Sequence, residues 1–185
     1  MRRCVGLDLS LTCTGAAVIT QRVSGDCVAN TTTVTSCGRR GDTLVDRHAR
    51  LTTLGAEIVR SATPADLVVV EGPVTGTRGG SPLDRYALWW FVVGGLIRRE
   101  VPVAVVAPAS LKLAIAGSGR ADKAAVAVAL ARLWPDVDVT SSDVSDAVGL
   151  AHLGAVHMGW PVTTLERHRQ VKVAWPIFGA EELAS

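Results

Sequence analysis

The sequence has little lysine, a small net charge and no long hydrophobic run. Among its 185 residues are only 3 lysines beside 16 arginines, and with 17 acids the net charge is +2. A charge this small does not by itself indicate a nucleic-acid partner. The preference for arginine suits bidentate contacts to phosphate, and it equally fits GC-rich coding, so both explanations stay open.

Charged residues make up only 19% of the chain, whereas hydrophobic residues make up 48%. An average domain has about 25% charged residues, and disordered chains have more charge and less apolar content. This composition excludes a disordered protein. The length fits one domain, whose core is large enough to fold without disulfides or a structural metal.

No pair of cysteines stands at C-x-x-C spacing and no Cys/His cluster has zinc spacing, so the four cysteines are expected to be reduced thiols. The longest apolar run, Tyr86–Ile97, has about 12 residues and is too short to cross a bilayer. Asp8 interrupts the apolar N-terminal stretch, which argues against a signal peptide. We therefore expect a cytoplasmic protein with no membrane partner.

The hydrophobic pattern predicts one α/β domain over residues 1–159. Three strands joined by short turns predict an antiparallel meander, and two continuous apolar runs predict buried parallel strands. The result is a mixed five-stranded sheet flanked by helices. The expected strands are 3–9, 16–20, 27–36, 67–71 and 101–106. The expected helices are 42–61, 81–99, 108–116, 122–134 and 140–158. Residues 160–185 show little periodicity and are expected to form an extension or tail, whose basic residues either touch DNA or are solvated.

Four acids stand where a charge is costly or where two charges share a face. Asp8 lies inside an apolar strand, and Glu71 ends a run of valines. Asp143 and Asp146 are three residues apart at the start of a helix, so they lie on one face. There are simpler explanations: Asp143 alone could favour the helix dipole, and a strand-end acid could cap a turn.

If the first strand neighbours the strand that ends at Glu71, the four acids meet at the carboxyl ends of the sheet. Four carboxylates cannot all stay ionised without cations, and oxygen ligands suit Mg²⁺ or Mn²⁺. Two such ions can clamp a phosphate and activate a water molecule. With these acids assigned to metal, 13 acids remain against 19 basic residues, so the surrounding protein is basic.

With these motifs the sequence resembles the RuvC family of Holliday junction resolvases, within the RNase H-like, or retroviral integrase-like, superfamily. The matching segments are 5–15, 69–72, 111–123 and 143–151, in this order. The stretch Gly-Ser-Gly-Arg-Ala-Asp-Lys at 117–123 is the most specific. The resemblance implies an RNase H-like fold and a homodimeric, metal-dependent endodeoxyribonuclease that cuts Holliday junctions or other branched DNA.

The resemblance also implies roles for individual residues. It assigns two Mg²⁺ ions per site, with Mn²⁺ as a substitute, to the four acids Asp8, Glu71, Asp143 and Asp146. Lys112 and Lys123 match basic residues that contact DNA or support the scissile phosphate, although solvated helix lysines would look the same. Arg120, beside Lys123, is a candidate phosphate contact. Arg78, in a glycine-rich loop after Glu71, either lines the DNA groove or belongs to an ordinary surface loop.

The chain departs from the family pattern at two motifs. Asp8-Leu9-Ser10 replaces the usual Asp-Pro-Gly, and Gly72 follows Glu71 in place of glutamine. Val74 stands where the family has an aromatic residue that probes bases. These departures concern sequence preference and leave the metal-binding acids intact, as in a divergent, phage-type member.

Other functions remain open at this stage. An RNase H-like nuclease acting on RNA would have similar acids, and a junction-binding protein without activity would have a similar surface. The hairpin from Gly6 to Gly15 also resembles the phosphate loop of actin-like and sugar-kinase proteins, although the chain is too short for their two domains. Trp89 and Trp90 point about 100° apart on one apolar helix, so this helix either forms a dimer interface or packs entirely inside.

Overall fold

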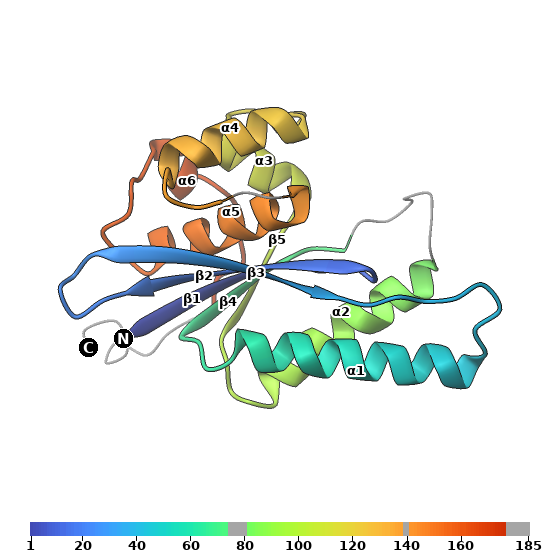
Figure 1. The fold of residues 1–185 in the computed structure, drawn as a ribbon. Helices are drawn as coiled ribbons and strands as arrows, with labels where there is room; N and C mark the ends of the chain where they lie inside the picture. The colour runs from blue at the N-terminus through green and yellow to red at the C-terminus, as the bar shows by residue number, and fades with distance from the viewer. Residues whose placement is uncertain (74–80, 139–140, 177–185) are drawn as a thin grey trace.

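The computed structural model describes residues 1–73, 81–138 and 141–176. Its five-stranded sheet has the order β3-β2-β1-β4-β5 (Figure 1). β1, β2 and β3 form an antiparallel meander, and β4 and β5 are parallel to β1 and to each other. The strands are β1 (Arg2–Asp8), β2 (Cys13–Gln21), β3 (Cys27–Thr35), β4 (Leu67–Glu71) and β5 (Val103–Val106). The mixed sheet expected from the sequence is confirmed.

Helices cover both faces of this sheet (Figure 1). α1 (Leu44–Ala62) and α2 (Pro82–Ile97) lie on one face. The other face carries α3 (Pro108–Ala116), α4 (Lys123–Leu133), α5 (Ser142–His157) and the short α6 (Glu166–Arg169). None of the helices in the described ranges has the length and hydropathy needed to cross a membrane.

Alternate residues of each strand feed two separate cores. Cys4, Leu67 and Val69 pack with α3, α4 and α5, whereas Val5 and Val68 pack with α1 and α2. This alternation is what a sheet buried on both faces requires, since successive side chains point to opposite sides. The continuous apolar runs in the sequence therefore indicate two covered faces.

The ends of the elements follow local chemistry. Thr43 caps α1 through a capping box with Asp46, so the helix starts at Leu44 rather than at residue 42. Ser81 caps α2 with Pro82 at its first position, as predicted. Ser141 caps α5 by accepting a hydrogen bond from the amide of Val144.

Residues 160–176 pack onto the domain. Trp160 is 4% exposed and belongs to the α5-side core. The guanidinium of Arg167 donates to the carbonyls of Ala114 (2.7 Å) and Ile115 (3.1 Å), which lie at the C-terminal end of α3. Ala174 forms an antiparallel bridge with Val105 of β5. The sequence pattern missed α6, because four residues are too few to show periodicity.

Candidate active site

Two of the predicted acids lie at the ends of neighbouring parallel strands. Asp8 is the last residue of β1 and Glu71 the last of β4, and the register pairs Leu7 with Val70 just before them. The two carboxyl groups lie close enough for the charge of Glu71 to raise the pKa of Asp8. The indole of Trp89, on α2, donates to the backbone carbonyl of Glu71 at 2.9 Å and fixes the end of the strand.

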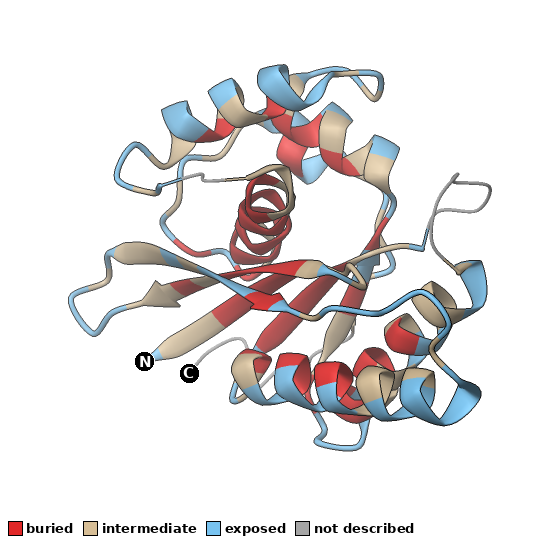
Figure 2. Ribbon diagram, turned by 45° about the vertical axis from the view of Figure 1, so that its right-hand side comes forward, coloured by how far each residue is buried: buried red, intermediate tan, exposed pale blue. Residues whose placement is uncertain are grey.

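The other two acids come from α5, which crosses the sheet directly beneath them. Almost all of this helix is buried, as its colour in Figure 2 shows, and Asp143 and Asp146 are only partly covered at its N-terminal end. A Cβ added at Gly6 would meet the carbonyl oxygen of Ala147 at 2.0 Å, and one at Gly15 would meet that of Asp143 at 2.1 Å. Both strand glycines therefore let α5 approach closely enough to bring its acids to Asp8.

The two glycines of the hairpin therefore contact a helix of the same chain. In an actin-like or sugar-kinase protein, the corresponding hairpin would have to face the phosphate of a nucleotide. Gly6 and Gly15 face the backbone of α5 instead. These two glycines therefore allow α5 to pack closely against β1 and β2, next to the acids.

Burial and mutual repulsion raise the pKa values of Asp8, Glu71 and Asp146. Desolvation, followed by the charges of Glu71, Asp146 and Asp143, raises the pKa of Asp8 to about 8. Desolvation and then Asp146 raise the pKa of Glu71 to about 7, although Lys112 partly opposes this. Desolvation also raises the pKa of Asp146, against the effect of Lys112 and Lys123. The four acids therefore interact as one group that strongly favours a compensating positive charge.

Two lysines from the other helices face this acid group. Lys112, on α3, acts electrostatically on Glu71 and Asp146. Lys123 starts α4, and its ammonium donates to the hydroxyl of Ser142 at 2.9 Å. The Ser142 hydroxyl in turn donates to Asp143 at 3.0 Å, so Lys123 is linked to an acid through one side chain. The sequence identified both lysines but not Ser142, because nothing in the pattern distinguishes it from its neighbours.

A cleft of about 470 Å³ opens beside the acids and includes Glu71, Asp143 and Lys123 in its lining. Arg85 and Tyr86, on the first turns of α2, line the same cleft. Neither residue was predicted from the sequence. No local sequence pattern distinguishes them from other residues of α2.

Of the two remaining predicted DNA contacts, the structure describes only Arg120, which is not part of the acid group. Arg120 lies on the exposed turn before α4, where its backbone amide donates to the Ser118 hydroxyl at 3.2 Å, and it does not line the cleft. Arg78 and Val74 lie outside the described residues.

The donor set fits a hard divalent cation. The four acids supply only carboxylate oxygens, which Mg²⁺ and Mn²⁺ prefer over softer ligands. The raised pKa values of Asp8, Glu71 and Asp146 indicate that these carboxyl groups retain protons more readily than usual when no cation compensates their charge. In the described part of the chain, no three Asp, Glu, His or Cys side chains are already arranged to hold a metal ion. The four carboxylates therefore suit Mg²⁺ or Mn²⁺ by their chemistry, although the described side chains are not already arranged around an ion position.

Curated proteins and a family model show which family this arrangement belongs to. The family model described as Crossover junction endodeoxyribonuclease RuvC matches residues 4–153. Proteins of the same name include one from Frankia alni, 38% identical over 81 residues, and one from Cutibacterium acnes, 41% identical over 85 residues. These matches cover 43% and 42% of this chain and only 39% and 43% of those relatives. The relative from Sphingopyxis alaskensis is 31% identical over 153 residues, which are 83% of this chain and 96% of the relative.

Solved structures show the same fold. The structure of RuvC from Thermus thermophilus matches with a TM-score of 0.66 at 20% identity, over 85% of this chain and 97% of that one. RuvC of T. thermophilus in complex with a Holliday junction substrate matches with a TM-score of 0.65 at 16% identity, over 85% and 96%. These likenesses establish the RNase H-like architecture. Since the family model spans residues 4–153 and the Sphingopyxis relative is matched over nearly its whole length, the chain belongs to the RuvC family of crossover junction endodeoxyribonucleases.

Proposed function

We propose that this protein is a Mg²⁺-dependent endonuclease that resolves Holliday junctions or related branched DNA. The observation that carries the proposal is the group of four acids, which comes from three elements and lies beside a cleft with Lys123 in its lining. Family membership supports the same conclusion. Because the proposed substrate is DNA, we expect the enzyme to act in the cytoplasm of a bacterium, or of a host cell if a phage encodes it.

Membership in the RuvC family implies a divalent metal ion. We assign two Mg²⁺ ions, with Mn²⁺ as a substitute, to Asp8, Glu71, Asp143 and Asp146. When bound, such ions polarise the scissile phosphate and lower the pKa of the attacking water. The protein's own contribution is to hold the four carboxylates together on a rigid sheet and helix.

Basic residues around the acids would bind and orient the DNA. Lys123 is within one hydroxyl of Asp143, which suits a residue that adds positive charge beside the scissile phosphate. Lys112 faces the acid group from α3 and would help to hold phosphate there. We also assign backbone contacts to Arg120, whose exposed position is open to a DNA strand, and to Arg78.

A homodimer would match the two-fold arrangement of a four-way junction. The outer side of α2 supports it, since Leu83, Trp90 and Ile97 recur every seven residues and are 76%, 64% and 59% exposed. Positions seven apart share one face of a helix. Large apolar side chains gathered on one exposed face are typical of an interface.

The direct test uses a synthetic four-way junction incubated with Mg²⁺ or Mn²⁺, with linear duplex of the same sequence as the control. We expect paired cuts on opposite strands of the junction and little cutting of the duplex. No cleavage in either metal, or equal cleavage of the duplex, would contradict the proposal. An RNA hybrid substrate in a parallel reaction separates this function from that of an RNA-directed nuclease.

A further inference from the structure

A second cavity, of about 550 Å³, lies next to the active-site cleft and is strongly basic. Arg39, Arg40, Arg47 and Arg50 line it, opposed by the two acids Asp42 and Asp84. It lies where the connection between β3 and α1 meets the first turns of α1 and α2. The sequence pattern alone predicts no functional role for this segment.

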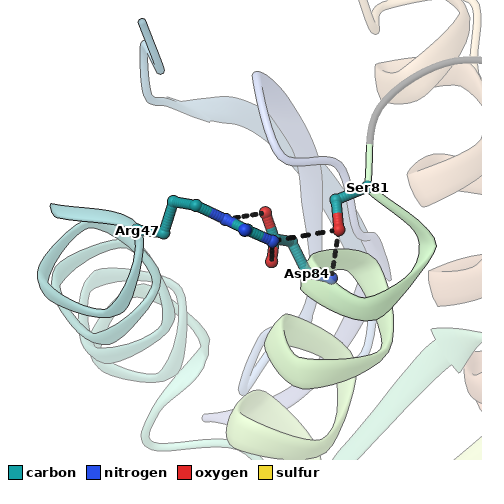
Figure 3. Close-up of polar contacts among 3 residues, drawn as sticks. All are labelled: Arg47, Ser81 and Asp84. Atoms are coloured by element: carbon teal, nitrogen blue, oxygen red, sulfur yellow. Dashed lines mark hydrogen bonds and ion pairs between the residues drawn. The ribbon is translucent and has the colours of Figure 1, made fainter. Parts of the chain in front are cut away.

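Two of the arginines build the cavity wall. Arg47 donates to both oxygens of Asp84, at 3.1 and 2.6 Å, and to the hydroxyl of Ser81 at 3.2 Å (Figure 3). The same hydroxyl caps α2 by accepting from the amide of Asp84. Arg47 therefore fixes the start of α2 to α1, and its charge is already balanced by Asp84.

Hydrogen bonds also fix the side chain of Arg50, to residues at the end of β3 and in the loop after β1. Its guanidinium donates to the hydroxyl of Ser36 at 2.8 Å and to the backbone carbonyl of Leu11. A Cβ at Gly38 would lie 2.1 Å from a guanidinium nitrogen of Arg50, so glycine at this place gives the arginine its room. Within the described ranges no acid forms a salt bridge with Arg50, and the cavity as a whole carries four arginines against two acids.

The other two arginines are exposed and open to a ligand. No side-chain acceptor binds the guanidinium of Arg39 or Arg40 in the part of the chain that the structure describes. Asp42 is engaged with the backbone, because its carboxylate accepts the amide of Arg39 at 2.8 Å. Arginine forks that are held in place, or exposed beside one another, match the geometry of phosphate oxygens.

This cavity is next to the site of chemistry. Leu9 lines the active-site cleft, and Thr12, on the same loop after Asp8, lines the basic cavity. On α2, Asp84 lines the basic cavity and its neighbour Arg85 lines the cleft. A polyanion that leaves the cleft across the first turn of α2 therefore reaches the arginines directly.

We propose that this arginine cavity binds the phosphate backbone of the DNA arm that leaves the cleft, outside the scissile position. The inference rests on the proposed nuclease function and adds a binding site to it. Contacts of this kind add affinity through released counterions and carry no sequence information. They should strengthen substrate binding without changing the chemical step.

The test replaces the two exposed arginines together, as Arg39→Ala with Arg40→Ala, in the full chain. Junction binding is measured in Ca²⁺ or with the Asp146→Asn background, over a range of salt concentrations. We expect the slope of log K against log salt to become shallower by about 2, since each lost phosphate contact removes about 0.9. Binding should weaken equally for junctions of different sequence, and the cleavage rate at saturating enzyme should stay unchanged.

A matched control is the pair Arg60→Ala with Arg132→Ala, in the last turns of α1 and α4. It removes the same charge far from the cavity and should leave the slope nearly unchanged. An unaltered slope in the Arg39/Arg40 variant, or a loss of rate at saturation without a loss of affinity, would overturn the inference. Failure of the wild-type protein to bind or cut junctions would instead contradict the proposed function. Thermal melting of both variants confirms that the fold is intact.

Discussion

The carboxyl groups of Asp8 and Glu71 hold protons at a pH where ordinary carboxyl groups are ionised. Their pKa values of about 8 and about 7 arise first from burial and then from neighbouring acids. The fold therefore keeps a proton in the metal-free site near neutral pH. A divalent cation would replace that proton, so metal binding and proton release are coupled.

This coupling predicts how the stability of the metal-free protein changes with pH. In EDTA, we expect the free energy of unfolding to fall between about pH 6.5 and pH 8. Both carboxyls have unfolded pKa values near 4, so across this window the folded state binds more protons and stability declines as the pH rises. Urea denaturation in EDTA at several pH values measures this change in the free energy of unfolding.

The Asp8→Asn variant provides the control for that measurement, because its side chain does not titrate. It should show a shallower decline, and Mg²⁺ should raise the wild-type stability most at the high end of the window. Below pH 6.5 the buried pair His152 and His168 acts in the opposite direction, since burial lowers their pKa values to about 3 and about 4. A wild-type stability that is flat or rising from pH 6.5 to 8 in EDTA would contradict the pKa shifts.

Asp146→Asn should abolish cleavage and spare junction binding. The substitution keeps the size of the side chain but removes one charged ligand, and loss of even an outer-shell partner of a metal costs roughly 10–100-fold. We expect the cleavage rate to fall by more than about 100-fold in a single-turnover assay. Asp136→Asn, at an exposed position outside the acid group, should cut at the wild-type rate. Cleavage by the Asp146 variant within a few-fold of wild type would remove this acid from the proposed machinery.

Which residues could be found from the sequence depends on whether their position is locally unusual. Asp8 and Glu71 stand out because each carboxylate ends an apolar strand, and the structure brings them together as expected. Ser142 and Tyr86 have ordinary neighbours and gain their place only when α4 packs against α5 and α2 packs against the sheet. Such residues need the three-dimensional arrangement, since no local pattern marks them.

At the scale of elements, the approach of α5 to the sheet decides whether the acids meet. Gly15 pairs with Asp8 in the β1–β2 register, and its Cα faces the backbone of Asp143. Gly15 therefore lies beside Asp8 in the sheet and also limits how closely Asp143 can approach. The sequence showed the glycine but could not show which helix would lie against it.

Gly15→Ala should therefore lower both stability and activity. The added methyl would lie 2.1 Å from the carbonyl oxygen of Asp143, which must move away. We expect a loss of roughly 1–3 kcal/mol in the free energy of unfolding, as for other overpacked sites, and a slower cleavage rate because Asp143 is displaced. Chemical denaturation and the junction assay measure the two effects.

Gly94→Ala is the matched control. It lies within α2 on the same face as Trp90, and the nearest atom that its Cβ would meet is on Arg98, at 3.5 Å. Analytical ultracentrifugation checks that the variant has the same oligomeric state as the wild type. A helix-interior alanine should leave stability unchanged or raise it by up to about 1 kcal/mol. If Gly15→Ala behaves like this control, close packing of α5 on β2 is not what positions Asp143.

The sequence also specified most element boundaries, but not the register of the meander or the C-terminal packing. Caps such as Ser81 are local signals and were found correctly. β2 starts at Cys13, three residues earlier than expected, because pairing with β1 reaches Gly15 and pairing with β3 extends the strand to Cys13. The contact of Arg167 with the end of α3 joins residues more than fifty positions apart, which periodicity cannot reveal.

At the scale of the whole molecule, the sheet separates two helical layers that have different roles. The α5 layer supplies two acids and both lysines, and the α1–α2 layer supplies the cleft wall and the exposed apolar face. Burial in Figure 2 is greatest along α5 and falls on the outer side of α1 and α2. One layer can therefore build the site while the other remains able to meet a second copy of the chain.

Trp90→Glu tests the proposed dimer across α2. Trp90 is 64% exposed between Leu83 and Ile97. A charge there would be buried unpaired in an interface, and loss of a central tryptophan commonly costs 2 kcal/mol or more, so the dimer dissociation constant should rise by at least about 30-fold. Analytical ultracentrifugation should find a wild-type dimer and a variant monomer, and junctions treated with the variant should accumulate single nicks. Val128→Glu, on α4 at 53% exposure, should remain dimeric. A variant that still dimerises would move the interface elsewhere, and a monomeric wild type would contradict the dimer itself.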